Sequence, residues 1–154
     1  MIDWFVEGRT WAATMNRIVM LNEDLESQMR MYLALCSRYR IEIAENELTL
    51  MRLLRRKKPS LLLLDAHYSC FSHNSKSVSK LVEKIKRKYN HLPVLTIVSS
   101  EDERAGEALA ERGADGWVNR RVEIDDLLQR VDNLLQPHRA FIETTYLQPQ
   151  EAMA

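Results

Sequence analysis

Two groups of acidic residues stand directly after apolar runs, at places where carboxylates can carry chemistry. Asp65 follows the run Leu61–Leu64, and the polar triplet 22–24 (Asn-Glu-Asp) follows Ile18–Leu21. Both runs are typical of buried parallel strands. In an open α/β sheet the ligand crevice lies at the carboxyl ends of the strands, where a carboxylate can meet a phosphate or a metal ion. We therefore expect Glu23 and Asp65 to share one solvent-facing acidic crevice, with Asp65 exposed in it.

The strands that position these carboxylates belong to a regular series of elements. Strand and helix periods alternate five times between Arg17 and Pro137, without a Gly/Ser linker, which indicates successive βα units. Strands are expected at 18–21, 41–44, 61–64, 94–98 and 116–118, and helices at about 25–37, 47–56, 78–89, 100–113 and 124–135. Right-handed crossovers fold such a series into a three-layer α/β/α sandwich around a five-stranded parallel sheet of order 2-1-3-4-5, the flavodoxin-like arrangement.

The expected helices differ in how clearly their ends and buried faces are marked. Ser100 and Glu103 make a capping box for the fourth helix, and Gly113 supplies its left-handed stop. Apolar stripes at helical spacing predict two buried faces. These are Leu25, Met29, Leu33 and Cys36 in the first helix, and Ile124, Leu127, Leu128, Val131, Leu134 and Leu135 in the last.

Length and composition fit a single domain with short extensions. The chain has 154 residues, and its 22 basic and 22 acidic side chains give no net charge that would attract nucleic acid or anionic lipid. No apolar run reaches the roughly 18 residues of a membrane span, and two isolated cysteines suit a reducing compartment, so we expect a cytoplasmic protein. The domain is predicted at 17–137. Residues 1–16, which are rich in aromatic side chains, are expected to form a packing or dimerising extension, and residues 138–154 a tail or linker.

From about Arg17 to Leu135 the chain resembles the receiver domain of two-component response regulators. The acidic pair of that family corresponds to the triplet 22–24, and its phosphoacceptor to Asp65. Residues 93–95 (Pro-Val-Leu) open the fourth strand as in the family, and residues 113–117 (Gly-Ala-Asp-Gly-Trp) are similar to its Gly-Ala-Asp-Gly-Tyr segment. The order and spacing of five elements carry the resemblance, because each motif alone is unspecific.

The resemblance implies a chemistry and a set of residues for it. Asp65 would accept a phosphoryl group from a histidine kinase, and a magnesium ion would neutralise the charge that develops. Its ligands would be Glu23, Asp65 and the backbone carbonyl of His67, with Asn22 and Asp24 nearby. Because Asn22 replaces a carboxylate with a neutral amide, the resemblance implies a weakened magnesium site. Ser99 and Arg120 would contact the phosphoryl group.

Several positions depart from the family pattern. Val98 takes the place of the Thr or Ser that binds the phosphoryl oxygen, and it has no hydroxyl. Arg120 replaces the family's lysine, which is not a neutral exchange because a guanidinium is planar and longer. Trp117 stands at the position of the rotating aromatic. Since its hydroxyl partner is missing, fixed packing is the favoured interpretation, with partner anchoring as another.

These departures favour an atypical or pseudo-receiver without enzymatic activity, which acts through protein contacts and largely without phosphorylation. Expected partners are signalling proteins such as a histidine kinase or an output domain, and a second copy in a homodimer. The docking surface would be the fourth helix, fifth strand and fifth helix. The alternative is a phosphorylatable switch at Asp65.

Other functions find little support in the sequence. A nucleotide- or flavin-binding flavodoxin-like protein is a second alternative, but there are only four glycines and no GxGxxG or Walker segment. His67, His73 and His91 lack metal-ligand spacing, so we expect solvated histidines. The basic third helix is most simply a solvated face.

Overall fold

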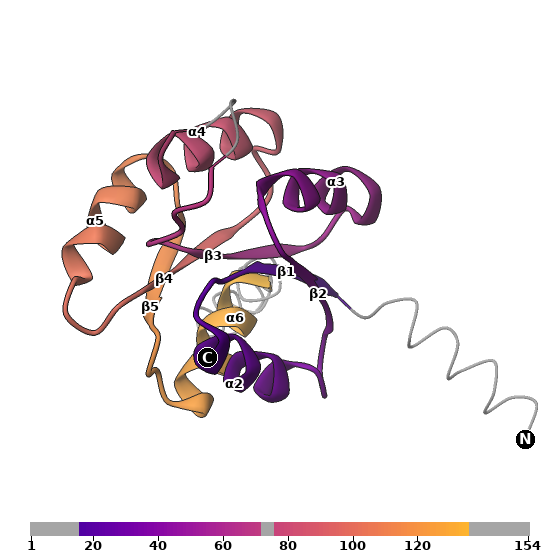
Figure 1. The fold of residues 1–154 in the computed structure, drawn as a ribbon. Helices are drawn as coiled ribbons and strands as arrows, with labels where there is room; N and C mark the ends of the chain where they lie inside the picture. The colour runs from indigo at the N-terminus through magenta and orange to yellow at the C-terminus, as the bar shows by residue number, and fades with distance from the viewer. Residues whose placement is uncertain (1–15, 72–75, 136–154) are drawn as a thin grey trace, which may run out of the picture.

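The computed structural model describes residues 16–71 and 76–135, which form a parallel sheet between two layers of helices (Figure 1). The strands are β1 (Arg17–Leu21), β2 (Arg40–Ala44), β3 (Leu61–Asp65), β4 (Val94–Val98) and β5 (Gly116–Asn119). The helices are α2 (Leu25–Leu35), α3 (Glu47–Lys57), α4 (Val78–Lys88), α5 (Glu103–Glu111) and α6 (Ile124–Leu135). The strand order is β2-β1-β3-β4-β5 with every pair parallel, which confirms the predicted fold.

Some predictions fall on parts of the chain outside the described residues. These are the N-terminal extension, apart from Asn16, the tail at 138–154, and His73. Asn16 already belongs to the domain, because its carbonyl accepts a hydrogen bond from the backbone N–H of Arg40 at 3.0 Å. No described helix combines the length and the apolar character needed to cross a bilayer, and the longest, α6, has 12 residues.

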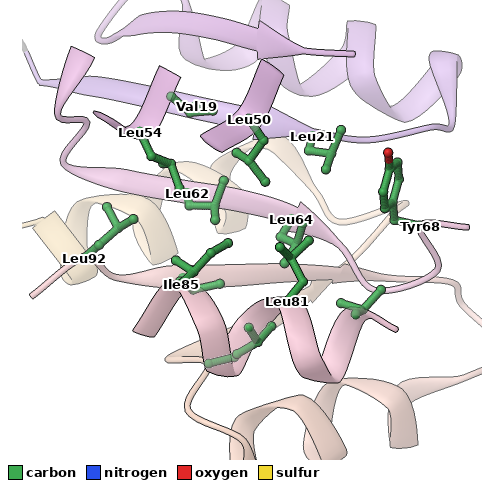
Figure 2. Close-up of a cluster of buried hydrophobic side chains, with 14 of the residues drawn as sticks. Val19, Leu21, Leu50, Leu54, Leu62, Leu64, Tyr68, Leu81, Ile85 and Leu92 are labelled. Atoms are coloured by element: carbon green, nitrogen blue, oxygen red, sulfur yellow. The ribbon is translucent and has the colours of Figure 1, made fainter. Parts of the chain in front are cut away.

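The central strand β3 is buried on both faces. Leu62 and Leu64 pack under α3, α4 and α5, whereas Leu61 and Leu63 pack against α2 and α6. Figure 2 shows the first of these cores, with side chains from β1, β3, α3 and α4 meeting between the sheet and the helices. Successive side chains of a strand point to opposite faces, so a strand covered on both sides needs an unbroken apolar run. That is why four consecutive leucines precede Asp65.

The predicted buried face of α2 is wrong. Leu25, Met29 and Leu33 are 70%, 62% and 66% exposed, and the helix instead buries Ser27, Met31 and Leu35. Cys36, also predicted to be buried, follows the helix and is exposed. Both sets of positions have helical spacing, so periodicity could not choose between them. A polar anchor accompanies the observed choice, because Asn22 Nδ2 donates to Ser27 Oγ at 2.8 Å and holds that face inward.

The start of α5 also differs from the sequence prediction, whereas its end agrees. The N-cap is Asp102 without a side-chain hydrogen bond, so no Ser100–Glu103 capping box forms. The Asp102 N–H bonds the Ser99 carbonyl at 3.2 Å in a turn before the helix. Gly113 has φ +121°, as the predicted left-handed stop requires. In α6 the apolar stripe is confirmed except at Ile124, which is 45% exposed.

Candidate functional site

The carboxyl ends of β1 and β3 lie side by side, because Leu21 pairs with Leu64 in the parallel register. This places Glu23 beside Asp65, and the Glu23 backbone N–H donates to Asp65 Oδ2 at 3.1 Å. The predicted proximity is confirmed, but the contact is made by the backbone of Glu23 and not by its carboxylate. The two acids therefore do not form a carboxylate pair that opens to one shared ligand.

Asp65 is completely buried, with 0% of the residue exposed, so the prediction of an exposed carboxylate is wrong. Its Oδ1 accepts the backbone N–H of His67 at 2.8 Å and lies 3.4 Å from Arg120 Nη2, while Oδ2 accepts from Glu23. The loop that begins at Ala66 thus folds back over the strand end. Buried charges persist in proteins when they are paired and hydrogen-bonded, and every partner here comes from the chain itself.

Arg120 supplies the positive charge of the site from the loop after β5. Its backbone N–H bonds the Val98 carbonyl at 2.8 Å, which extends the β4–β5 pairing and aims the side chain toward β3. The side chain is 29% exposed, and its Nε is buried without a hydrogen-bond partner among the described residues. One end of the guanidinium therefore neutralises Asp65, while the other remains in reach of solvent.

The Glu23 carboxylate turns away from Asp65 toward the loop after β3. Its Oε1 accepts the Ser69 backbone N–H at 2.6 Å, and both of its oxygens lie within 3.2 Å of Ser69 Oγ. Hydrogen bonds to an ionised carboxylate are among the stronger ones in proteins. Glu23 therefore fastens the loop that covers Asp65.

Asn22 and Asp24 organise the start of α2. Asn22 is buried, and its Oδ1 accepts the Asp24 backbone N–H at 3.1 Å, opposite its bond to Ser27. Asp24 is the N-cap, and its carboxylate accepts the Ser27 backbone N–H at 3.1 Å. The side-chain and backbone hydrogen bonds with Ser27 lower the pKa of Asp24 below its ordinary value. These two residues hold the helix in place and are both turned toward it.

His67 connects two loops across the carboxyl edge of the sheet. Its Nε2 accepts the Ser99 backbone N–H at 3.0 Å. The expectation of a solvated histidine is wrong here, whereas His91 is exposed as expected. No local pattern in the sequence marks this contact, because it joins residues 32 positions apart.

Val98 and Trp117 stand where the resemblance placed them, at the end of β4 and within β5. Val98 is fully buried and pairs with Asn119. The Trp117 indole packs on α5 at Gly106, where an added Cβ would come within 2.4 Å of the ring. Arg130 donates to the Trp117 carbonyl at 3.0 Å. The observed packing supports the fixed-residue interpretation of Trp117.

Sequence reasoning missed Tyr68, which locks the loop after β3 into the core. Tyr68 is 3% exposed, packs edge-on against Phe71 with ring centroids 5.0 Å apart, and accepts the Glu47 N–H at 3.1 Å. Burial is the main cause that raises the pKa of Tyr68. Figure 2 shows the ring at the end of the buried cluster beyond Leu64. Two aromatic residues in a short polar loop were the available signal.

The magnesium site stays a prediction, and its two side-chain ligands, Glu23 and Asp65, are engaged by other groups of the chain in this arrangement. No group of three His, Cys, Asp or Glu side chains among the described residues could hold an ion. Both Asp65 oxygens already accept hydrogen bonds, Glu23 binds Ser69, and Arg120 brings a positive charge to the carboxylate. A divalent cation and this guanidinium would compete for the same oxygen.

A polar cavity of about 290 Å³ opens beside the buried carboxylate. Its lining includes the predicted phosphate contacts Ser99 and Arg120, but neither Asp65 nor Glu23. The remaining lining residues are Asp24, Glu26, Ser27, Arg30, Ser100, Glu101 and Arg121. Arg120 lines this cavity and also contacts Asp65, so it stands between the buried carboxylate and the cavity.

No protein-family model and no curated protein matches the sequence. Solved structures do match it. The N-terminal receiver domain of a response regulator from Bacteroides fragilis aligns with TM-score 0.71 and 20% identity, over 80% of this chain and 98% of that one. The receiver domain of NtrX from Brucella abortus gives 0.69 and 18%, over 77% and 98%.

The chain has the receiver fold. A CheY-like receiver protein from Methanospirillum hungatei agrees, with TM-score 0.69 at 17% identity over 82% of this chain. A longer NtrX chain from Brucella abortus, whose structure contains ADP, matches with TM-score 0.72, and this chain spans 29% of its length. At identities this low the structural match establishes the fold alone, so the function must be argued from the site.

Proposed function

We propose that the chain is a degenerate receiver domain that acts in signal transduction through protein contacts and without phosphorylation of Asp65. The observation that carries this proposal is the closed Asp65 site. The carboxylate is fully buried, and its oxygens are taken by the Glu23 and His67 N–H groups and by Arg120. A nucleophile must reach its substrate, and this one is covered by the chain's own loop.

Arg120 explains how the Asp65 carboxylate can stay buried without a bound cation. In the resembling family a bound cation offsets the negative charges that meet during phosphoryl transfer. Here a guanidinium 3.4 Å from Asp65 supplies a permanent positive charge on the protein. At position 98 there is only a buried valine, so no hydroxyl there can bind a phosphoryl oxygen. Both changes favour one stable conformation over a switch between two.

The test is phosphorylation in vitro with acetyl phosphate and magnesium, read by intact mass, beside a receiver known to be phosphorylated. We expect no added phosphoryl mass on this chain. A parallel titration with beryllofluoride in a Trp4→Phe/Trp11→Phe variant, in which Trp117 is the sole tryptophan, should leave its fluorescence unchanged. A mass gain that disappears in Asp65→Asn would overturn the proposal in favour of the phosphorylatable switch.

A restoration variant sharpens this test. Val98→Thr with Arg120→Lys returns the hydroxyl and the ammonium of the resembling family to their positions. If the two departures are what silences the site, the double variant should gain phosphoryl mass that the parent chain lacks. The single variants serve as matched controls, and circular dichroism checks that the buried threonine is tolerated, because Val and Thr are not equivalent in a core.

Exposed apolar residues on α2 support the protein-contact part of the proposal. Leu25, Met29 and Leu33, here called the α2 stripe, lie in one row of the helix and are more than 60% exposed. Single exposed apolar residues are ordinary, but a contiguous row marks an interaction surface. On the expected docking face of α5, β5 and α6, Ile124 is the one exposed large apolar residue among those described, and at 45% it is less exposed than the α2 stripe.

We assign the α2 stripe to a second copy of the chain. Glu26 and Arg30 flank the stripe with opposite charges, so an antiparallel α2 pair would place Glu26 opposite Arg30 of the other copy. The zero net charge of the chain also offers little repulsion between copies. Such a contact matches the homodimer expected from the sequence.

Light scattering after size exclusion tests this assignment. We expect a dimer for the parent chain, a monomer for Leu33→Glu, and a dimer for the control Leu48→Glu, which places the same charge at a 67% exposed position on α3. A parent chain that stays monomeric at about 1 mM would put any dimer Kd above the millimolar range and would refute it.

A further inference from the structure

A second cavity lies at the amino end of the sheet, opposite the Asp65 site, and we refer to it as the basal cavity. It has a volume of about 570 Å³ and is lined by the end of α3, the end of α4 and the segments that lead into β3 and β4. Its lining residues are Leu54, Arg55, Lys58, Pro59, Ser60, Lys88, Tyr89, Asn90, His91 and Leu92. Figure 2 shows Leu54 and Leu92 at the opposite end of the core from Tyr68.

The walls of the basal cavity combine apolar surface with positive charge. Leu54, Pro59, Tyr89 and Leu92 supply carbon surface, and no carboxylate is among the lining residues. Small-molecule sites typically enclose about 300–1,000 Å³ within mostly apolar walls that carry a few polar groups. The volume of this cavity lies within that range, and its walls have the same mixed composition.

The cations at the rim are not explained by pairing within the domain. Arg55, Lys58 and Lys88 are exposed, and none of them takes part in an ion pair among the described residues. The one recorded contact of Lys88 Nζ is with the Tyr89 ring, 5.6 Å from its centroid. These three side chains therefore remain available to an anion.

Helix dipoles account for only part of this charge. The last turn of α3 carries Arg55, Arg56 and Lys57, and that of α4 carries Lys86, Arg87 and Lys88. Each helix end has about half an elementary negative charge, so two ends offset roughly one cation. Lys86 is paired with Asp115. A clear excess of positive charge remains around an apolar cavity.

Tyr89 adds a polar group that lacks a partner. Its hydroxyl is buried and makes no hydrogen bond within the described chain. A buried donor without an acceptor is costly to keep, and such groups call for an explanation. A ligand that offers an acceptor to this hydroxyl would supply the missing hydrogen bond.

We propose that the basal cavity binds a small organic anion with a planar apolar body, such as a nucleotide or an aromatic carboxylate. The planar part would lie against Leu54, Pro59 and Leu92, and its anionic group would meet Arg55, Lys58 and Lys88. An apolar cavity floor favours a small molecule over a nucleic-acid strand, which needs an extended charged track. This proposal is independent of the state of Asp65.

Binding is tested on the full chain with four probes. We use 5′-AMP, adenosine as the ring without the charge, inorganic phosphate as the charge without the ring, and anilinonaphthalene sulfonate as a planar anion without phosphate. Calorimetry should give a Kd below about 1 mM for AMP or for the sulfonate, with adenosine and phosphate at least about tenfold weaker. Amide shifts should centre on Leu54, Tyr89 and Leu92.

The relative affinities of AMP and the sulfonate distinguish a phosphate-specific site from a general one for planar anions. Failure of both to bind below about 1 mM would overturn the proposal. So would amide shifts centred on the polar cavity beside Arg120.

A matched pair of double variants separates the cavity from general surface charge. Lys58→Gln/Lys88→Gln removes two lining cations, and Arg56→Gln/Arg87→Gln removes two exposed cations of the same helices that do not line it. We expect the first to weaken binding at least about tenfold and the second less than about threefold. Equal losses, or tighter binding of a single-stranded oligonucleotide that both variants reduce alike, would indicate a polyanion-binding surface and refute the cavity.

Discussion

At the carboxyl end of the sheet a buried carboxylate has its charge met by Arg120 and two backbone N–H groups. At the amino end, Arg55, Lys58 and Lys88 surround a cavity that has no carboxylate in its lining. The resemblance of the fold draws attention to the first end. The charged and polar groups at the first end bind one another, whereas the three cations at the second end have no ion-pair partner among the described residues.

The position of a site in a fold and its capacity to bind a ligand are therefore separate properties. Receiver-like topology brings Asp65 to the customary edge, but Arg120 and the loop through Ser69 close that edge. Function has to be argued from the groups that remain available.

Arg120→Met should have the largest effect, because it leaves the buried Asp65 carboxylate without its cation. We expect the free energy of unfolding to fall by about 3 kcal/mol, at the lower end for a broken buried pair because Arg120 is partly exposed. Urea denaturation measures the change. Arg121→Met, at an exposed position in the same loop, is the control, and adding Asp65→Asn should restore part of the loss. A loss under about 1 kcal/mol would show a surface-like pair and an open site.

Gly106→Ala tests whether the Trp117 side chain is held in one position against α5. The new methyl group would overlap the indole, so we expect a loss of about 2 kcal/mol in spite of the better helix propensity of alanine. Thermal and urea denaturation report the loss. Gly116→Ala is the matched control, since its Cβ would meet only Leu95 at 3.4 Å. A gain in stability for Gly106→Ala would mean that the ring moves aside freely, as a rotating switch residue would.

Asp24→Ala tests the cap that anchors α2 at the carboxyl end, with an expected loss of about 1 kcal/mol at neutral pH. Because the folded pKa of Asp24 is lowered, its contribution is complete above the ordinary value of 3.8 and is lost as the pH falls through the folded pKa. The difference between variant and parent chain should therefore shrink in acid. Glu26→Ala, in the first turn of the same helix, is the control. A difference that does not depend on pH would exclude the carboxylate as the cap.

Lys58→Gln/Lys88→Gln should have the smallest effect on folding, a change within about 0.5 kcal/mol. Neither lysine pairs with a described carboxylate, and both stand among like charges. Urea denaturation beside the Arg120→Met series gives a direct comparison of the two ends. A loss as large as that of Arg120→Met would mean that the basal cations hold the domain together and are not free for a ligand.

Much of the fold could be predicted because its signals are local. The run Leu61–Leu64, the stop at Gly113 and the stripe of α6 each act through neighbours in sequence, and all three agree with the structure apart from the exposed Ile124. The predicted capping box of α5 was wrong because the local sequence offers more than one cap residue. Asp102 lies between Ser100 and Glu103 and is itself a good cap residue, and a turn back to the Ser99 carbonyl set the helix start.

The location of the candidate site could be predicted from the sequence, but the burial of Asp65 could not. Parallel strand order alone brings residues 23 and 65 together. The burial of Asp65 depends on Arg120, 55 positions away, and on the loop that Glu23 holds from 46 positions away. Such contacts leave no periodic trace, because any polar residue in a loop fits the same local pattern.

By itself, the amino-acid sequence determined the sequence of strands and helices, their sheet order and the edge where Asp65 would stand. The elements follow from apolar periodicity, and the sheet order follows from the crossover rule together with the resemblance to receiver domains. Only the tertiary structure decided that the α2 stripe faces outward, that Asp65 is sealed by Arg120, and that a cation-rimmed cavity opens at the other end. The physical reason is that helix rotation and side-chain burial are set by contacts between segments far apart in the chain, and both stripes of α2 satisfy the local rules equally well.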